Sequence, residues 1–426
     1  MKKPKTILII GTFDTKRDEL EFIRSVIVGE GATVLTMDVS VLGDAGDRPL
    51  DYSKHDVAAA AGVTIAEVIA AGDENHAMAL MSAGAQSLAM RLCADGAFDG
   101  MISLGGTMGT DLALDVALAL PLGMPKYIVS TVAFSALIPP DRLAADVQMI
   151  LWAGGLYGLN AICRSALSQA AGAVLGAAHT ASGLKLERPL IGVSSLGNAC
   201  LTYMKRLKPA LEERGYEVAF FHAQGMGGRA LENLASEGKL AAVFDLCLQE
   251  FSNGVHGSII NSGPERLERV GRAGVPQIIA PGAADLVDLP SWKPIPAHFR
   301  DRPFHVHNKL ITSLMLTAEE RRVTAREMAL RLNKSIGPTH VVLPLAGVEE
   351  WDRAGQIGHD PDSLAAFFEE VRAHLRPPVT CSEVAAHIND GAFVDAVLAI
   401  FDGWVAAGLV ERSPASPSGT MSTAAC

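Results

Sequence analysis

The sequence lacks several patterns that would assign a function directly. Its six cysteines are scattered with no CxxC pair, which fits reduced cytosolic thiols better than a disulfide framework or a structural zinc site. Basic residues are not in excess, and a net charge of −11 argues against a surface that coats nucleic acid. No apolar stretch is long enough to predict a membrane span. The sequence also has no Walker A loop and no GxGxxG.

Length and composition predict a protein of more than one domain. A chain of 426 residues suggests two or three domains, and 49% apolar with 19% charged residues is typical of a globular enzyme-sized protein. The apolar run after MKKPK is too short for a signal segment, so a cytoplasmic protein is expected. The segment TASGLKLER interrupts the periodicity as a linker would. We therefore expect domains at 1–183 and 184–412, and a disordered tail at 413–426.

The first strand-like segment ends in a polar loop that suits a ligand. Residues 7–10 predict a buried strand, and a helical pattern begins after Lys16. In an open α/β sheet, such strand-end loops line the ligand crevice. Backbone N–H groups at the following helix start carry partial positive charge, which suits a phosphate. The alternative is an ordinary β–α turn in which Asp14 or Thr15 caps the helix.

A second loop of this kind follows a predicted strand at residues 101–104. It reads GGTMGT, residues 105–110, and a helix is expected over 112–120. Glycines let backbone amides close on a phosphate where a side chain would collide with the ligand. The alternative is a tight turn that packs the helix on the strand. Two such loops in one half favour an anion-binding crevice.

Two further strand ends contribute candidates to this half. Asp38 ends the second strand, where an acidic residue often meets ribose hydroxyls, although it could instead face solvent. A strand over 125–131 ends in two hydroxyl residues. The candidate nucleotide-binding residues are Gly11, Thr12, Asp14, Thr15, Lys16, Asp38, Gly105, Gly106, Thr107, Gly109, Thr110, Ser130 and Thr131.

A second series of strands and helices begins at residue 189. The alternation predicts an α/β protein with two Rossmann-like domains, each a mostly parallel sheet flanked by helices. His222 ends the second strand of this half, where it could transfer protons or serve as a structural hydrogen-bonder. Residues 286–304 are rich in proline and predict a lid or covering loop.

Polar residues near the other strand ends are candidates for a second ligand. Asp245 lies in a predicted strand and Glu250 follows it. His305 and His307 could place two metal ligands on one face of a strand, but no third ligand stands at a diagnostic spacing. The candidate substrate-binding residues are Ser195, Asn198, Gly227, Gly228, Ser262, Gly263, His307 and Asn308.

Cys200 is a candidate nucleophile, at the start of a helix expected over 199–214. The positive end of a helix dipole lowers the pKa of a thiol and raises its thiolate fraction, and His222 could act as its base. The alternative is a small apolar residue packed under the loop. The catalytic candidates are Cys200, His222, Asp245 and Glu250.

The ordered motifs resemble one family. They are GTFDTK at 11–16, GGTMGT at 105–110, FHAQGMGG at 221–228, SGPERL at 262–267, HNKLITSLMLTAEE at 307–320 and LPLAG at 343–347. Their order and spacing are similar to those of a two-domain ATP-binding family that includes the N-terminal half of the tomato mosaic virus resistance protein, with bacterial members of unknown function. The resemblance covers about residues 5–410 and implies ATP binding in the first domain and a homodimer.

With ATP as the implied ligand, the first loops acquire specific roles. Asp14 would hold Mg²⁺, which prefers few carboxylates together with phosphate oxygens, and Lys16 would offset phosphate charge. The family's glycine loop usually resembles GGSGGT, and here Met108 replaces a glycine. Segments near Asp245 and before Ser262 also depart from the family pattern, so the second ligand is expected to differ from that of other members.

Two functions are compatible with these features. The first is an ATP-dependent or nucleotide-regulated enzyme that acts on a small hydroxylated or carboxylated metabolite in the second domain. The second is a nucleotide-binding sensor or interaction module without turnover, which the resemblance allows because plant members act by binding a viral protein. An enzyme should bring ionisable groups with shifted pKa values together in the second crevice.

Overall fold

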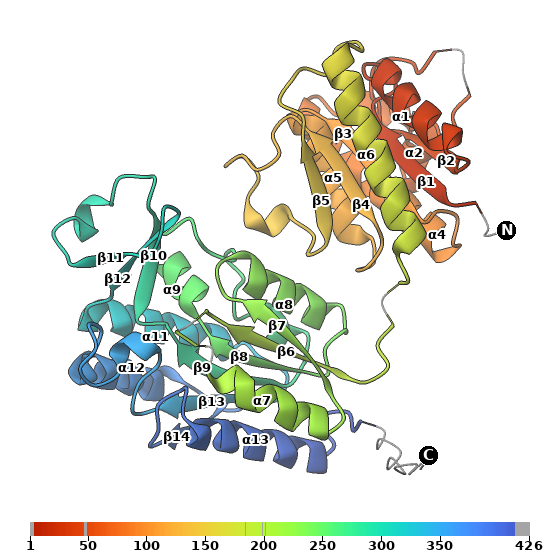
Figure 1. Ribbon diagram of the computed structural model, residues 1–426. Helices are drawn as coiled ribbons and strands as arrows, with labels where there is room; N and C mark the ends of the chain where they lie inside the picture. The colour runs from red at the N-terminus through yellow and green to blue at the C-terminus, as the bar shows by residue number, and fades with distance from the viewer. Residues whose placement is uncertain (1–3, 47–48, 184, 198, 201, 414–426) are drawn as a thin grey trace, which may run out of the picture. The chain divides into compact units, whose positions relative to one another are not determined.

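The computed structural model describes residues 4–46, 49–183, 185–197, 199–200 and 202–413. The chain divides into two compact units, Met1–Lys185 and Leu186–Cys426. Each unit contains a parallel sheet with helices on both faces, which confirms the predicted pair of Rossmann-like domains (Figure 1). Apart from Ser413, the predicted tail lies outside the described residues. No helix in the described part of the chain is long and apolar enough to cross a membrane.

The first unit is built on a sheet in the order β2-β1-β3-β4-β5. All neighbouring strands are parallel, so helices must connect them across the faces of the sheet. The strands are β1 (Thr6–Gly11), β2 (Thr33–Asp38), β3 (Gly100–Gly105), β4 (Lys126–Ser130) and β5 (Val147–Leu151). The helices are α1 (Arg17–Gly29), α2 (Lys54–Ala60), α3 (Ile65–Ile69), α4 (Glu74–Ala94), α5 (Thr107–Ala119) and α6 (Ala161–Thr180).

Apolar side chains alternate along the central strand and build a core on each face. Ile7 and Ile9 of β1 pack on α1 and α6, whereas Leu8 and Ile10 pack on the helices α2 to α5. Helix α1 contributes Leu20 and residues three and seven positions later, which is the spacing of one helix face. Figure 1 shows α1 and α6 together on one side of this sheet.

The strand order of the first unit places its two predicted loops together. From β1 the chain first adds β2 on one side and then β3 on the other, so the order reverses between β1 and β3. Gly11 pairs in register with Asp38, and Gly105 pairs with Ser130, so these strands end level with one another. The loops after β1 and β3 therefore flank the switch point, where open α/β sheets bind ligands.

The second unit repeats this arrangement with one more strand. Its large sheet has the order β14-β13-β9-β8-β6-β7, all parallel, and its switch point lies between β6 and β8. The strands are β6 (Leu190–Ser195), β7 (Glu217–His222), β8 (Ala242–Cys247), β9 (Gln277–Gly282), β13 (Thr339–Pro344) and β14 (Thr380–Val384). The helices are α7 (Thr202–Glu213), α8 (Met226–Ser236), α9 (Gln249–Val255), α10 (Arg269–Arg272), α11 (Ala318–Leu332), α12 (Pro361–His374) and α13 (Gly391–Ala406). Helices α7 and α13 share one core, and α9, α11 and α12 share another.

A small antiparallel sheet is inserted between β9 and α11. It consists of β10 (Leu286–Pro290), β11 (Phe304–Val306) and β12 (Ile311–Met315), in the order β10-β12-β11. Val287 and Leu314 lie on the face that packs a small apolar core around Phe299. This sheet corrects the prediction of a covering loop over 286–304, because residues 286–290 form strand β10 and β11 begins at Phe304.

Two edge strands also differ from the sequence prediction. β5 and β14, each at one edge of its sheet, lie in segments for which no strand was predicted. An edge strand has a neighbour on only one side, and neither strand contains a buried residue. They therefore lack the continuous apolar run that marks a central parallel strand.

Candidate functional site

The first unit has a cavity of about 630 Å³ at its switch point. The loop after β1 contributes Thr12, Asp14, Thr15 and Lys16, and the loop after β3 contributes residues 105–109. Much of the remaining lining is apolar, with Val39, Val41, Leu42, Val68, Ile69 and Met78. The structure thus brings together eight of the thirteen nucleotide-binding candidates in one cavity.

Two helix N-termini open on this cavity without a side-chain cap. Lys16 is the N-cap of α1 and Gly106 is the N-cap of α5, and neither offers a capping acceptor to the first turn. The first-turn N–H groups of α1 and α5 have no intrahelical acceptor and carry partial positive charge. The remaining helices of this unit are capped by Ser53, Thr64, Asp73 and Asn160.

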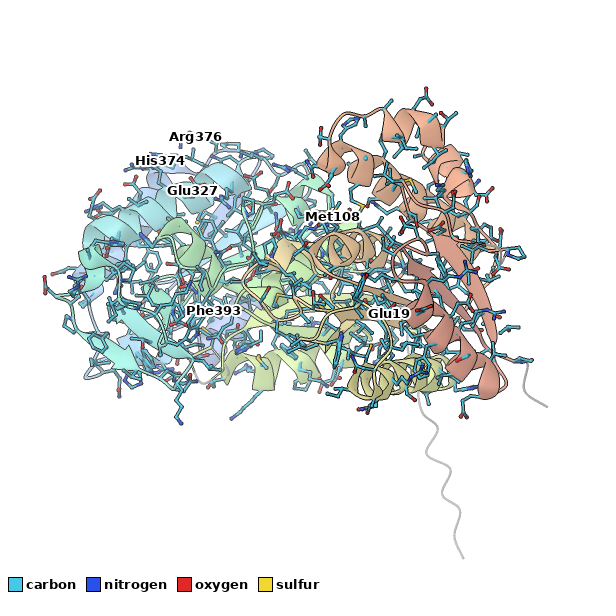
Figure 2. All side chains as sticks on the ribbon, turned by 90° about the horizontal axis from the view of Figure 1, so that it is seen from above. Glu19, Met108, Glu327, His374, Arg376 and Phe393 are labelled. Carbon is cyan, nitrogen blue, oxygen red and sulfur yellow. The ribbon has the colours of Figure 1, made fainter. Side chains whose placement is uncertain are left out.

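The glycines of the second loop have different roles. A Cβ atom at Gly105 would lie 2.6 Å from the Cα of Gly109, so glycine is required where α5 packs on β3. A Cβ at Gly106 would meet only Thr131 Oγ1, at 3.8 Å, and its φ of −77° suits any residue. The protein itself therefore leaves open space beside the backbone of Gly106, which a ligand could occupy. Met108, the departure from the family pattern, is 44% exposed in the first turn of α5 (Figure 2).

Asp14 and Lys16 supply opposite charges to the cavity. Asp14 accepts hydrogen bonds from Ser40 Oγ at 3.0 Å and from the Gly43 N–H at 3.2 Å. Because a carboxylate has about four acceptor positions, these two bonds leave room for a further ligand. The Lys16 ammonium donates to the carbonyl of Leu156.

Asp38 holds the first loop in place and does not line the cavity. It is buried, and its Oδ1 accepts hydrogen bonds from the N–H groups of Phe13 at 3.2 Å and Ser40 at 3.0 Å. This placement differs from both expectations for Asp38, since it faces neither the cavity nor solvent.

Four other candidates of this half also support the loops from outside the cavity lining. The buried hydroxyls of Thr110 and Ser130 are 2.7 Å apart and join α5 to β4. The N–H of Thr131 donates to the Gly105 carbonyl. A Cβ at Gly11 would lie 2.7 Å from Leu20, so glycine there lets α1 pack closely on β1.

The second unit has a cavity of about 620 Å³ at the corresponding switch point. His222, Gln224 and Gln249 reach it from the carboxyl ends of the large sheet. The small sheet and its turn contribute Asp288, His305, His307, Asn308 and Ser313, and Trp351 completes the polar and aromatic lining. Of the predicted second-ligand residues that the structure describes, only His222, His307 and Asn308 line this cavity.

Asp288 is the acidic group of this cavity. It is 3% exposed and accepts hydrogen bonds from Ser313 Oγ and from Gln224 Nε2, the latter at 3.2 Å. Burial raises the pKa of Asp288 above its ordinary value, and the hydrogen bonds from Ser313 and Gln224, together with the nearby amide of Gln249, oppose that rise. A buried carboxyl group with a shifted pKa beside a histidine is common at functional sites.

The predicted catalytic residues Asp245 and Glu250 lie in a buried ion cluster instead. Arg266 donates to both carboxylates, through Nη2 to Asp245 at 2.8 Å and through Nε to Glu250 at 2.7 Å. Glu232 lies 3.5 Å from the same guanidinium. Burial raises the pKa of Glu232 to about 7, against the opposing charge of Arg266. The four side chains are almost fully buried and line neither cavity.

Gly227 and Gly228 are required by the packing of this cluster. A Cβ at Gly228 would lie 1.5 Å from Glu250 Oε1, and a Cβ at Gly227 would lie 1.9 Å from the carbonyl oxygen of His222. Glu250 also accepts a hydrogen bond from the Gly225 N–H at 2.6 Å. The N-cap and first turn of α8 therefore enclose an internal carboxylate.

Cys200 corrects the predicted thiol activation. Its Sγ is fully buried, and α7 begins at Thr202, so Cys200 is not in the first turn of that helix. The hydrogen bond with Cys247 and the burial of the thiol raise the pKa of Cys200 well above its ordinary value, where a helix dipole was expected to lower it. This is the buried, packed cysteine of the alternative interpretation.

The remaining candidates that the structure describes do not line the cavity. Ser195 pairs with His222 at the end of β6 but lies outside the lining. Ser262 is buried, and Gly263 adopts a φ of +92° in the same loop. Asn198 lies outside the described residues.

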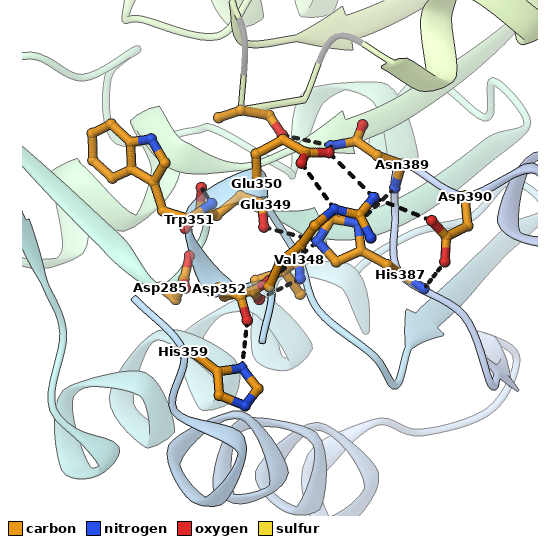
Figure 3. A network of polar contacts seen from close by, with 12 residues as sticks. Asp285, Val348, Glu349, Glu350, Trp351, Asp352, His359, His387, Asn389 and Asp390 are labelled. Carbon is orange, nitrogen blue, oxygen red and sulfur yellow. Dashed lines mark hydrogen bonds and ion pairs between the residues drawn. The ribbon is translucent and has the colours of Figure 1, made fainter. Parts of the chain in front are cut away.

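Buried carboxyl groups gather beneath the loop that carries Trp351 (Figure 3). Glu349 accepts a hydrogen bond from the Trp351 N–H at 2.7 Å, and His387 Nε2 lies 3.2 Å from Asp352 Oδ1. Burial, with the nearby Asp285 charge, raises the pKa of Glu349 to about 9. Burial also raises the pKa of Asp285 to about 6, although Arg321 opposes the rise.

Comparison with known proteins places this chain in a family. Models of the N-terminal and C-terminal domains of an uncharacterised protein family, UPF0261, match residues 5–183 and 188–405. A UPF0261 protein of Brucella melitensis biotype 1 is 54% identical over 406 residues, which cover 95% of this chain and 97% of that protein. The chain belongs to the UPF0261 family.

The resemblance to the tomato protein is also confirmed for this UPF0261 chain. The ToMV resistance protein Tm-1(GCR237) of Solanum lycopersicum is 27% identical over 422 residues, which cover 93% of this chain and 55% of that protein. Among solved structures, Acinetobacter baumannii MurG covers 93% of this chain and 100% of its own, with 12% identity and a TM-score of 0.24. That likeness is too weak to bear on function.

Sequence patterns could have indicated some of the cavity residues that were missed. These residues of the UPF0261 chain are Gln224, Gln249, Asp288, His305, Ser313 and Trp351. The segments LVDLP and ITSLM alternate with period two, which places Asp288 and Ser313 on the face opposite Val287 and Leu314. Gln249 and Trp351 follow strand ends without any pattern of their own. Within the described residues, no group of three histidine, cysteine or acidic side chains could hold a metal ion.

Proposed function

We propose that this UPF0261 protein binds ATP in the cavity of the first unit. The observation that carries the proposal is the pair of uncapped helix N-termini, α1 and α5, that open on one cavity, which Lys16 also lines. Helix N-termini and ammonium groups both favour phosphate groups. The family resemblance of the GTFDTK and GGTMGT motifs supports the same ligand.

The remainder of the cavity suits a nucleoside. A volume of about 630 Å³ can hold a whole nucleotide, since ligand cavities commonly measure roughly 300–1,000 Å³. The apolar side chains of Val39, Val68 and Met78 offer a surface for an aromatic base. Backbone amides and Lys16 would then hold the phosphates at the strand ends.

Asp14 fits the role of a Mg²⁺ ligand. It lines the cavity, and its two hydrogen bonds leave acceptor positions on the carboxylate. Mg²⁺ usually takes one or two carboxylates and fills its other positions with water and phosphate oxygens. A magnesium ion bound with the nucleotide would reduce the repulsion between Asp14 and the phosphates.

The second cavity favours an enzyme over a sensor. It brings His222 and the buried Asp288, with its raised pKa, to one cavity at a switch point. Such groups suit proton transfer to or from a small metabolite. We therefore propose an ATP-dependent or nucleotide-regulated enzyme that acts on a small metabolite. The alternative is a sensor that binds ATP without turnover.

Calorimetry with ATP and Mg²⁺ tests the proposal on the full-length protein. Lys16→Gln should weaken ATP binding by about tenfold or more, because it removes one positive charge from the phosphate end. Lys208→Gln, a change at an exposed position of helix α7 in the second unit, should leave the affinity unchanged. The proposal would be contradicted if ATP did not bind to the wild type, or if Lys16→Gln and Lys208→Gln bound ATP with equal affinity. Release of ADP in the presence of the metabolite would distinguish the enzyme from the sensor.

A further inference from the structure

We propose that the cavity of the second unit binds an uncharged, hydroxylated molecule of the sugar class, which Asp288, Gln224 and Gln249 hold by hydrogen bonds. This site has no residue in common with the proposed ATP cavity, so its ligand can be tested separately. It also defines the second ligand more narrowly than the sequence did, because a carboxylated metabolite is excluded.

A row of polar side chains crosses the small sheet and faces the cavity. Asp288 of β10 pairs with Ser313 of β12, and Ser313 pairs with His305 of β11. Directly paired residues on neighbouring strands lie on the same face of a sheet. All three residues line the cavity, whereas Val287 and Leu314 pack the core on the other face. The insertion therefore presents a polar face to the carboxyl ends of the large sheet.

Asp288 and Gln249 are buried polar groups with capacity for a ligand. Asp288 accepts one hydrogen bond at each oxygen, from Ser313 and Gln224, which leaves further acceptor positions. Gln249 is fully buried, and its Oε1 accepts from Asn253 Nδ2 at 3.4 Å. The Gln249 Nε2 group lies close enough to Asp288 to lower the pKa of that carboxyl, but it makes no hydrogen bond of normal geometry within the described residues.

These groups match the hydrogen bonds of a hydroxyl group. A hydroxyl donates one hydrogen bond and accepts others, so it can donate to Asp288 while it accepts from the amide of Gln249. His222, His305 and His307 add ring nitrogens that can donate or accept. A molecule with several adjacent hydroxyls would use this set more fully than one with a single polar group.

The charges of the cavity disfavour an anion. None of the described residues that line it is a lysine or arginine, and Asp288 contributes a carboxyl group. The N–H donors at the N-terminus of α8 already have an acceptor, because Glu250 accepts hydrogen bonds from the N–H groups of Gly225 and Gly228. The first cavity differs because it has Lys16 and two uncapped helix starts, although Asp14, Asp73 and Glu74 also line it. A carboxylate or phosphate would gain little attraction here and would approach Asp288 at a cost.

Trp351 adds an apolar surface for the carbon face of a sugar. Its ring lines the cavity and contacts His305 edge-on, with ring centroids 4.9 Å apart. An indole combines a broad apolar face with a polar N–H, which suits a ligand that has both kinds of surface. A cavity of about 620 Å³ accommodates a monosaccharide or a somewhat larger molecule.

Calorimetry with matched sugars tests the proposal on the full-length protein without ATP. The probes are D-ribose and D-glucose, their aldonates and phosphates, and D-glucosamine as a cationic control. A neutral sugar should bind at least about tenfold more tightly than its charged partners, because the site hydrogen-bonds hydroxyls and lacks a cation. Tighter binding of an aldonate, phosphate or amine, or no binding of either neutral sugar at millimolar concentration, would overturn the proposal.

Two variants connect this binding to the named residues. Asp288→Asn keeps the shape of the side chain and should weaken the sugar by about tenfold or more, because a charged acceptor is lost. Gln249→Met removes the buried donor with little change of volume and should weaken sugar binding by a similar factor. It takes the place of Asp288→Asn in the test if that variant does not fold. Asp395→Asn, at an exposed ion pair with Arg206 on the surface, is the control and should bind like the wild type. Unchanged affinity in a folded Asp288→Asn or Gln249→Met variant would refute the site.

Discussion

Replacement of Gly106 by aspartate or asparagine separates capping of α5 from binding of a nucleotide. Either side chain can accept hydrogen bonds from the first-turn N–H groups of α5, which lack a cap. The open space around a Cβ at 106 means that neither variant should disturb the fold. Relative to glycine, a cap adds a few tenths of a kcal/mol, and the aspartate charge at the helix start adds about 0.3–1 kcal/mol more.

Without ATP, both variants should therefore melt at or above the temperature of the wild type. For a unit of this size, each kcal/mol raises the melting temperature by about 2–4 °C. With ATP the order should reverse, because the new side chain occupies the donors that the phosphates need. We expect about tenfold weaker binding for Gly106→Asn, from lost donors. Gly106→Asp should lose about 100-fold, because like charges roughly 4 Å apart near a protein surface repel by as much as about 4 kcal/mol.

Differential scanning calorimetry measures both effects in one experiment. At an ATP concentration of about 100 times the wild-type Kd, the ligand stabilises the wild type by about 2.7 kcal/mol. By the same relation, the gain falls to about 1.4 kcal/mol for Gly106→Asn and about 0.4 kcal/mol for Gly106→Asp. The reasoning is refuted if ATP raises the melting temperature of all three proteins equally, or if the variants are less stable than the wild type without ATP.

Three further predictions concern the second unit and assembly. Glu349→Gln should make the free energy of unfolding less dependent on pH. The pKa of Glu349 in the folded protein is about 9, above its ordinary value of 4.5. The wild type therefore loses stability as the pH rises from 4.5 to 9, by roughly 1 kcal/mol per pH unit. Urea denaturation that shows the same change in the free energy of unfolding between pH 6 and pH 8 for both proteins would contradict this. Cys200 should resist iodoacetamide at pH 8 until the protein unfolds, because its thiol is buried and its pKa is raised, and rapid labelling of the native protein mapped by mass spectrometry would show otherwise. We also expect a homodimer, to which the exposed Phe134 and Tyr157 would contribute apolar surface, and light scattering that finds only a species near 44.8 kDa would argue against it.

The fold and the first cavity follow closely from the sequence. Central parallel strands such as β1 and β3 are buried on both faces, so they appear as apolar runs, and the polar loops after them are easy to locate. Adjacent strand ends in a parallel sheet then bring those loops together without any knowledge of side-chain contacts. The edge strand β14 gave no such signal, because one of its sides faces away from the sheet.

The second site could not be assembled in the same way. Asp288 reaches its cavity only through the register of three short antiparallel strands, which local pattern does not determine. Asp245 and Glu250 had the sequence signature of functional acids, since both lie near a strand end. Their partner is Arg266 of the SGPERL motif, and the sequence does not show whether a carboxylate meets a ligand or an internal arginine. Part of the family's motif pattern thus supplies an internal ion cluster.

The carboxylate of Glu250 at the start of α8 acts as a permanently attached counter-ion. Because it belongs to the chain, it is present at a high effective concentration and cannot be diluted away. The starts of α1 and α5 have no side-chain cap, although Asp18 and Glu19 lie in the first turn of α1, and their N–H groups would depend on an acceptor from solution. If that acceptor is ATP, the lifetime of the first unit in the cell would follow the nucleotide supply, since a ligand that binds only the folded state protects it from unfolding and proteolysis. The second unit would remain folded when the nucleotide is depleted. A fall in cellular ATP would therefore destabilise the first unit and leave the stability of the second unchanged.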